Sequence, residues 1–263
     1  MKHFKLILVV IIAATFLLLS SCGDDTATNA PATNSDNYFP LTQSSEWEYD
    51  AYTLNMDGTV DADTKRDILM KISGVKKYGN IEYAGMVIQE NDVETDKQYH
   101  YSDSWKLFVN KEVVEPTYEG LNLSFFLDKL SETIVIADLN EDKWVLLEDK
   151  VEDYDLGIEF MDVPVTLTGD ITIICNKGVA GKVTLGDLTD VDAQEFTLVY
   201  SFQGTTIMNA PLDFSLTVHR WYAIDMGLVL ETMDSESINP AGISIGVDIR
   251  GNRIVLKEAT IQE

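Results

Sequence analysis

Cysteine and histidine are scarce in this chain, and their scarcity excludes several kinds of site. There are two cysteines, Cys22 and Cys175, so neither a disulfide framework nor a Cys-based metal site is expected. The three histidines, His3, His100 and His219, include no pair at zinc-ligand spacing, and no G-x-S-x-G motif occurs. We expect Cys175 to be a buried, unreactive thiol, and His100 and His219 to lie on strand surfaces.

Basic residues are also few. The chain has 19 Lys and Arg against 44 Asp and Glu, which gives a formal net charge of −25. Such a surface repels nucleic acids and anionic headgroups, so no nucleic-acid partner is expected. The acidic residues are scattered along the chain, a distribution that favours solubility at a crowded cell surface over a single cation site.

The chain lacks an apolar run long enough to cross a membrane comfortably. Its longest run is Leu6 to Leu19, which follows the basic segment Met1–Lys5 and has the length of a secretory signal. The next residues, Leu19-Ser20-Ser21-Cys22, resemble a bacterial lipobox, in which the cysteine is acylated and the peptide is cut before it. We therefore predict a signal peptide over residues 1–21 and lipidation at Cys22. The alternative is an ordinary signal peptide with an incidental cysteine.

The residues after Cys22 bear on where the protein resides. Two or more acyl chains on Cys22 would give a lasting membrane anchor. Gly23 stands where an Asp would resemble an inner-membrane retention signal, and Asp24-Asp25 resembles the export signals of Bacteroidetes-type surface lipoproteins. We predict an outer-membrane lipoprotein, facing the periplasm or the cell surface. Residues 22–37, rich in Asp, Thr, Ala, Asn, Pro and Ser, are predicted to be a disordered tether.

Residues 38–263 are predicted to form a single β-rich domain. Trp47, Tyr49 and Ala51 alternate along one strand face, and Asp57-Gly58 is typical of a hairpin turn. Short apolar runs separated by turn residues continue to the C-terminus, as in antiparallel all-β folds. We expect one helix over Leu121–Leu130. We also expect a terminal hairpin that joins 243–249 to 254–261.

Three segments resemble a group of largely uncharacterised bacterial envelope lipoproteins. Tyr38-Phe39-Pro40-Leu41 with Trp47 and Tyr49 is similar to the group's Y-F-P-L…W-x-Y opening. Residues 192–196 resemble its A-G-T-F strand entry, and residues 221–229, Trp-Tyr-Ala-Ile-Asp-Met-Gly-Leu-Val, resemble its W-Y-A…G-L-V ending. The chain departs from the pattern at Ser44 or Ser45, Gln194 and Asp225, where the group usually has glycine.

The resemblance implies an architecture and no activity. Members of the group look like a strongly curved antiparallel sheet, sometimes wrapped about a helix, similar to periplasmic lipoprotein carriers. The expected fold is therefore all-β and mainly antiparallel, a half-open barrel or sandwich with one short helix against its concave face.

Two acidic segments have part of a calcium-loop pattern. Asn55–Asp63 has alternating carboxylates around Gly58, but Thr64 stands where the last carboxylate ligand is needed. Asp138–Asp149 has similar spacing, with Lys143 at the glycine position. A hairpin turn with solvated acids is the favoured interpretation of the first segment, and a calcium site is disfavoured at the second, so no cofactor is expected.

Aromatic residues provide the better functional clue. Most of them are expected to pack in the core or at a barrel rim. The alternative is a platform for a sugar or an apolar ligand, since aromatic faces supply contact area at low entropic cost. The candidate platform consists of Trp47, Tyr49, Trp105, Trp144, Trp221 and Tyr222.

These observations favour a non-catalytic binding or interaction module that holds a lipid-like or other apolar ligand. The second hypothesis is a structural or assembly lipoprotein with a protein partner in the envelope. An envelope hydrolase is third, because no nucleophile–base set is visible. An apolar cavity open to solvent would favour the first hypothesis, and a filled core beneath an exposed apolar patch the second. A cleft holding two carboxylates with raised pKa values would favour the hydrolase.

Overall fold

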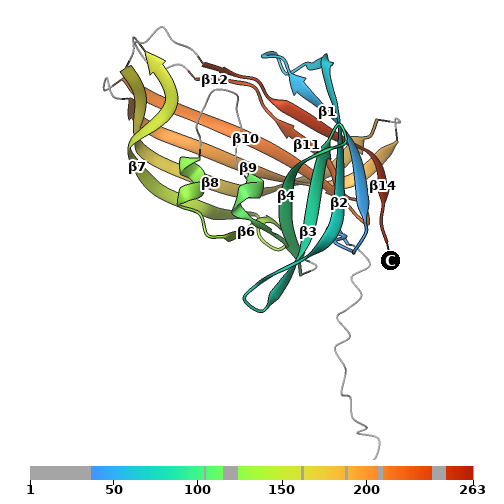
Figure 1. Cartoon of the computed structure of the whole chain (residues 1–263). Coiled ribbons are helices and arrows are strands. Elements are labelled where there is room, and N and C mark those ends of the chain that lie inside the picture. The colour runs from blue at the N-terminus through green and yellow to red at the C-terminus, as the bar shows by residue number, and fades with distance from the viewer. Residues whose placement is uncertain are drawn as a thin grey trace, which may run out of the picture. The chain divides into compact units, whose positions relative to one another are not determined.

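The computed structural model describes residues 37–103, 105–114, 124–160, 163–186, 189–206, 210–238 and 247–262. Residues 36–263 form a compact unit (Figure 1). All described strands and both hydrophobic clusters belong to this unit, so we expect it to fold without residues 1–35. The predicted signal peptide, Cys22 and the tether up to residue 36 lie outside the described residues.

The unit is all-β and antiparallel, as predicted. Twelve strands form one sheet in the order β6-β5-β4-β3-β2-β1-β14-β11-β10-β9-β8-β7, and β12 pairs with β13 in a second, small sheet. The strands are β1 (Glu46–Leu54), β2 (Val60–Tyr78), β3 (Ile81–Glu90), β4 (Val93–Ser102), β5 (Lys106–Asn110), β6 (Thr133–Asp138), β7 (Lys143–Phe160), β8 (Val163–Thr184), β9 (Asp190–Thr206), β10 (Pro211–Ala223), β11 (Gly227–Met233), β12 (Glu236–Ile238), β13 (Val247–Ile249) and β14 (Asn252–Thr260).

Alternation of side chains decides which face of the sheet is buried. In β9, Phe196, Leu198, Tyr200 and Phe202 are all buried, and the residues between them are partly exposed. A strand places successive side chains on opposite faces, so these four share the concave side. The expected face of Trp47, Tyr49 and Ala51 in β1 is confirmed by their burial.

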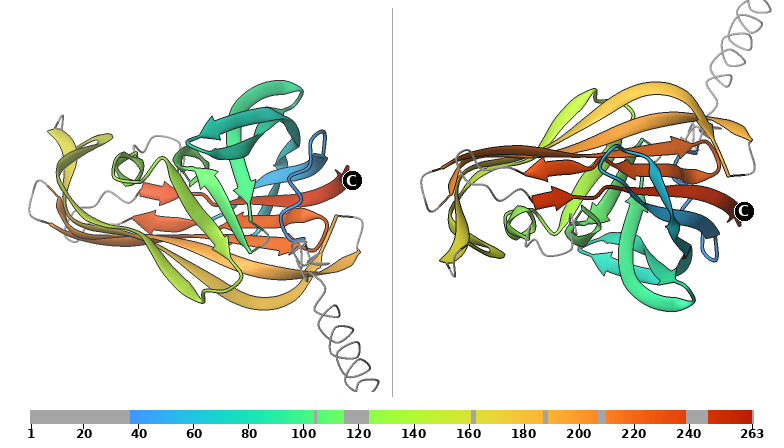
Figure 2. Two further views of the ribbon diagram at one scale, coloured as in Figure 1. Left: turned by 90° about the horizontal axis from the view of Figure 1, so that it is seen from below. Right: turned by 90° about the horizontal axis from the view of Figure 1, so that it is seen from above.

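The sheet curls until it nearly closes into a barrel. Its edge strands, β6 and β7, are joined by the short segment Leu139–Asp142. The indole Nε1 of Trp144 in β7 donates a hydrogen bond to the carbonyl oxygen of Val135 in β6, 2.8 Å away, and so links the two edges. Figure 2 shows the first strands of the chain facing β8–β10 across the interior.

The helix is shorter than predicted. Helix α2 spans Phe125–Asp128, not Leu121–Leu130, and residues 121–123 lie outside the described residues. A 3-10 turn, η1, covers Lys111–Val114. Phe125 and Phe126 are fully buried, and the ring of Phe126 meets Tyr200 of β9 edge-on at 5.5 Å. The expected placement of a helix on the concave face is therefore confirmed. Within the described part of the chain, no helix has the length and apolar character needed to cross a membrane.

Two expectations about connectivity had different outcomes. The turn at Asp57-Gly58 is confirmed, since it joins β1 to β2. The terminal hairpin is wrong. Strand β13 pairs with β12, whereas β14 lies between β1 and β11. Pairing of the last strand with the first joins the two halves of the sheet, and no local turn signal reveals this long-range pairing.

Candidate functional site

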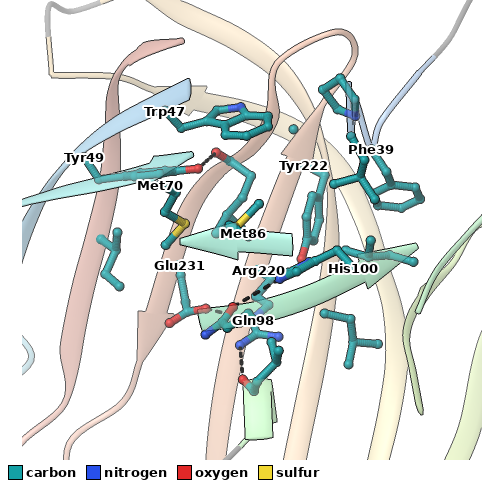
Figure 3. A pocket seen from close by; sticks show the side chains of 18 of the residues that line it. Phe39, Trp47, Tyr49, Met70, Met86, Gln98, His100, Arg220, Tyr222 and Glu231 are labelled. Atoms are coloured by element: carbon teal, nitrogen blue, oxygen red, sulfur yellow. Dashed lines mark hydrogen bonds and ion pairs between the residues drawn. The ribbon is translucent and has the colours of Figure 1, made fainter. Parts of the chain in front are cut away.

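A partly open apolar pocket lies inside the curved sheet. It has a volume of about 220 Å³ and is bounded by β1–β5 on one side and by β10 and β11 on the other (Figure 3). This volume exceeds the roughly 150 Å³ of an apolar cavity known to take up benzene. Aliphatic side chains supply much of the lining, among them Ile68, Met70, Met86, Ile88, Leu107 and Ile254.

Two aromatic residues of β1 form a fixed wall of this pocket. Trp47 Nε1 donates to the carbonyl oxygen of Met226 at 2.6 Å, and the Tyr49 hydroxyl donates to that of Leu228 at 3.0 Å. Burial raises the pKa of Tyr49 well above its ordinary value, so this phenol remains a neutral donor. The polar end of each ring is thus satisfied by the β11 segment, and each aromatic body lines the pocket.

The start of the folded unit forms another wall. Tyr38, Phe39, Pro40 and Leu41 line the pocket, and the ring of Phe39 meets that of Tyr222 edge-on at 5.2 Å. The segment that follows the predicted tether is therefore part of the site.

Gly227, at the start of β11, has a φ of +78°, and this left-handed conformation suits glycine. A Cβ atom added there would lie 3.4 Å from Cδ of Pro40 and 3.3 Å from Nε1 of Trp47. Glycine at this position therefore lets the β11 segment approach both walls closely.

A buried ion pair forms the polar end of the pocket. Arg220 of β10 donates through Nε to Oε2 of Glu231 in β11 at 2.7 Å, and through Nη2 to the carbonyl oxygen of Val113 at 3.3 Å. The two side chains are 11% and 15% exposed. Burial lowers the pKa of Arg220, but the Glu231 charge outweighs that effect and the pKa lies above its ordinary value. The guanidinium is therefore always charged, and the pair carries no net charge.

One donor of this guanidinium has no hydrogen-bond partner among the described residues. Nη1 of Arg220 is buried and unpaired, although Nε and Nη2 of the same group are both bonded. A buried donor without an acceptor costs roughly 1–3 kcal/mol. An acceptor placed in the pocket would therefore satisfy this donor.

His100 of β4 is the second polar group of the pocket. Its Nε2 lies 3.1 Å from Oε1 of Gln98, and the amide of Gln98 donates in turn to Asp96. Burial, with a smaller contribution from the Arg220 charge, lowers the pKa of His100 to about 3. His100 is only 8% exposed, so the prediction that it lies on the strand surface is wrong.

The low pKa of His100 predicts a loss of stability in acid. The unfolded chain takes up this proton near pH 6.5, whereas the folded protein does so only near pH 3. Stability is therefore lost as the pH falls from about 6.5 towards 3. Between pH 7 and pH 5, the wild type should lose roughly 2 kcal/mol more unfolding free energy than His100→Asn. Urea titrations of both proteins at the two pH values measure this difference, and equal losses would contradict the assignment.

The structure brings together half of the predicted aromatic platform. Trp47, Tyr49 and Tyr222 line the pocket, and burial raises the pKa of Tyr222 to about 12. The other three residues lie elsewhere: Trp105 is 47% exposed, Trp144 links the sheet edges, and Trp221 packs over Gly181. The six residues therefore do not form one surface.

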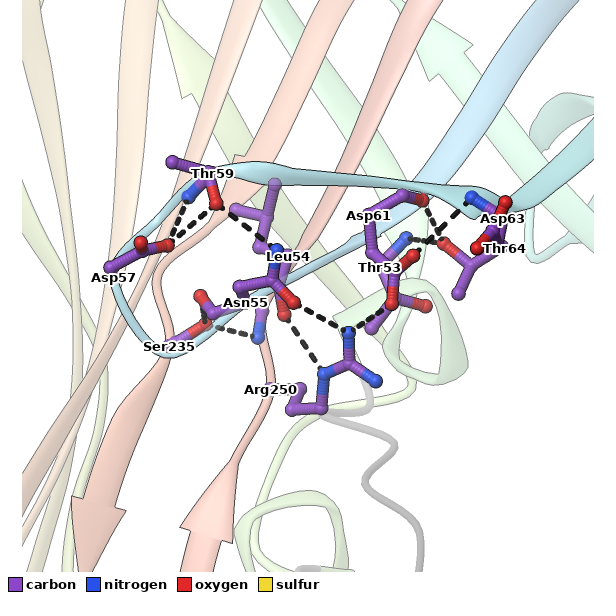
Figure 4. Close-up of polar contacts among 11 residues, drawn as sticks. Thr53, Leu54, Asn55, Asp57, Thr59, Asp61, Asp63, Thr64, Ser235 and Arg250 are labelled. Carbon is purple, nitrogen blue, oxygen red and sulfur yellow. Dashed lines mark hydrogen bonds and ion pairs between the residues drawn. The ribbon is translucent and has the colours of Figure 1, made fainter.

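The first calcium-loop candidate is a hydrogen-bonded hairpin turn (Figure 4). Asp57 accepts hydrogen bonds from the backbone and side chain of Thr59, which lower its pKa. Asp61 lies 2.7 Å from Nη2 of Arg250, and this hydrogen bond lowers its pKa. Thr64, at the last ligand position, accepts from the backbone of Thr53. The carboxylates face different partners and do not converge.

The second calcium-loop candidate is similarly dispersed. Asp138 lies 2.8 Å from Nζ of Lys106, Asp142 lies 3.1 Å from Lys177, and Asp149 lies 3.3 Å from Lys129. Each carboxylate thus has its own lysine. The described residues contain no group of three or more His, Cys, Asp or Glu that could hold a metal ion.

The last two residues singled out in the sequence, Cys175 and His219, lie in different surroundings. Cys175 is buried and free, and burial raises the pKa of its thiol to about 12, as expected for an unreactive cysteine. His219 is partly buried, with Nδ1 2.7 Å from Oε1 of Glu195.

Sequence reasoning missed Arg220, although a signal was present. Leu212, Phe214, Leu216 and Val218 alternate as buried residues along β10, and continuing that period places Arg220 on the concave face. A charged residue at an inward position is a stronger indication of a site than an aromatic residue beside a strand.

Comparisons with known proteins identify no family for this chain. No protein-family model matches the chain, and no curated protein matches it. One similar solved structure is a candidate lipoprotein from Parabacteroides distasonis, with 9% identity and a TM-score of 0.39. Another is a candidate exported protein with a YmcC-like fold from Bacteroides fragilis, with 10% identity and a TM-score of 0.37. Each alignment covers 86% of this chain and 99% of the other. At these values we draw no functional inference from either.

Proposed function

We propose that this protein is a lipid-anchored envelope protein whose β domain is a non-catalytic binding module for an apolar ligand. The observation that carries the proposal is the partly open apolar pocket of about 220 Å³ inside the curved sheet. The lipobox-like segment ending at Cys22 supports the anchor, and Gly23 in place of an Asp supports an outer-membrane location. An open apolar cavity is the feature that favours ligand binding over the alternative structural or assembly role.

The composition of the pocket also bears on the hydrolase alternative. Among the described residues, its lining includes a single carboxylate, Glu231, which is paired with Arg220. Its histidine, His100, bonds to an amide and holds a very low pKa. These groups suit recognition of a ligand better than a nucleophile–base reaction.

Filling the pocket should abolish binding. Met70 lines the pocket and is only partly buried, so Met70→Trp adds volume where the sheet can accommodate a larger side chain. Residues 36–263 should bind the fluorescent apolar probe N-phenyl-1-naphthylamine, and Met70→Trp should weaken that binding at least about tenfold, or 1.4 kcal/mol. Fluorescence titration measures both affinities.

Met56→Trp is the matched control. Met56 is 41% exposed in the β1–β2 turn and does not line the pocket, so this variant should bind the probe as the wild type does. Failure of the wild type to bind, or equal binding by Met70→Trp, would overturn the proposal. Circular dichroism confirms that each variant is folded.

A further inference from the structure

We infer that the pocket selects an apolar molecule with an uncharged oxygen acceptor, such as the carbonyl of a fatty acyl ester, and that Nη1 of Arg220 binds this oxygen. The inference rests on the proposed function and specifies the ligand class of the same site. It depends on the unpaired Nη1, the charge of the groups around it and the apolar lining.

The unpaired donor calls for an oxygen acceptor. Arg220 lines the pocket and is 9% exposed, and its Nη1 has no partner among the described residues. Nε and Nη2 are held by Glu231 and Val113, which fixes the plane of the guanidinium. A ligand oxygen that reaches Nη1 would satisfy the donor without rearranging the ion pair.

The charge of the site selects against a carboxylate. Arg220 is already neutralised by Glu231 at 2.7 Å, and His100 is uncharged near neutral pH. The remaining polar lining includes Gln98, Tyr49 and Tyr222, and both phenols stay protonated. An anionic headgroup would add an unbalanced charge close to Glu231, in surroundings that solvate it poorly. An ester or amide carbonyl offers the same acceptor without that charge.

The apolar lining accommodates the rest of such a molecule. Met70, Met86, Ile68 and Ile254 surround the space beyond the ion pair. Methionine side chains adapt to irregular shapes, as a flexible acyl chain requires. A second, more open cavity of about 400 Å³ shares Phe39, Leu41 and His100 with the pocket.

Competition for the bound fluorescent probe tests the inference at pH 8. Methyl octanoate, octanoate and octane have hydrocarbon parts of similar size and differ in the polar end. Methyl octanoate should displace N-phenyl-1-naphthylamine from residues 36–263 at a concentration at least about tenfold below that of octanoate. It should also be more potent than octane.

Two variants assign the preference to Arg220. Arg220→Met combined with Glu231→Met replaces the buried pair with apolar side chains, and should lose the preference for the ester over octane when both competitors are measured against this variant's own affinity for the probe. Arg220→Lys keeps a cation for Glu231 but lacks the planar fork, and should also lose that preference.

The outcomes separate this inference from the proposed function. If the probe binds and the three competitors act alike, or octanoate is the most potent, the ligand class is wrong and the binding function stands. If both variants keep the ester preference, Arg220 does not bind the ester. If the wild type binds neither the probe nor any competitor, the proposed function fails and the inference fails with it.

Discussion

Replacing Glu231 by alanine is expected to lower the unfolding free energy by about 3–5 kcal/mol. The substitution leaves the Arg220 guanidinium buried and charged without its counter-ion, and breaking a buried pair on one side typically has a cost of this size. Both side chains are more than four-fifths buried, so water cannot readily replace the lost carboxylate. Urea unfolding of residues 36–263 measures the change.

Two controls isolate the cause of that loss. Glu82→Ala breaks the exposed pair with Lys77, whose side chains are 58% and 68% exposed, and should change stability little. Combining Glu231→Ala with Arg220→Met removes the stranded charge and should restore most of the lost stability. If the single and double variants were equally destabilised, lost packing and not the buried charge would be responsible.

The buried faces of the strands could be predicted from the sequence because the alternation of buried and exposed side chains is a local property. Trp47, Tyr49 and Ala51 share a buried face for this reason, and the same period along β10 runs through Leu216, Val218 and Arg220. This alternation shows which side chains face inwards. It does not say which part of a twelve-stranded sheet they will face, since that depends on how the whole sheet curls.

The pocket and the C-terminal pairing could not be predicted for that reason. Strand β14 follows Gly251 as a hairpin partner of the preceding strand would, yet it joins β1 and β11. Trp47 and Tyr49 donate to carbonyl oxygens 179 residues away in sequence, so their role depends on the same long-range closure. The burial of His100 depends on the same curvature, because the pattern of β4 alone does not show that this side chain faces the pocket.

Replacing Phe126 by alanine should also cost about 3–5 kcal/mol, the usual range for a fully buried phenylalanine. Its ring stacks on Phe125 at 4.3 Å and meets Tyr200 at 5.5 Å, so truncation leaves a void between α2 and β9. Val179→Ala is the control, because Val179 is 76% exposed and should tolerate the change. Urea unfolding compares the two variants.

Phe126→Ala is also expected to destabilise helix α2 itself. A four-residue helix has almost no stability of its own, so α2 exists because its aromatic side chains are buried on the concave face. Phe126→Ala should therefore speed amide hydrogen exchange in residues 125–130, while β9 and β10, held by continuous strand pairing, remain protected. A loss below about 1 kcal/mol with unchanged exchange in α2 would mean that Phe125 and Leu127 hold the helix without Phe126.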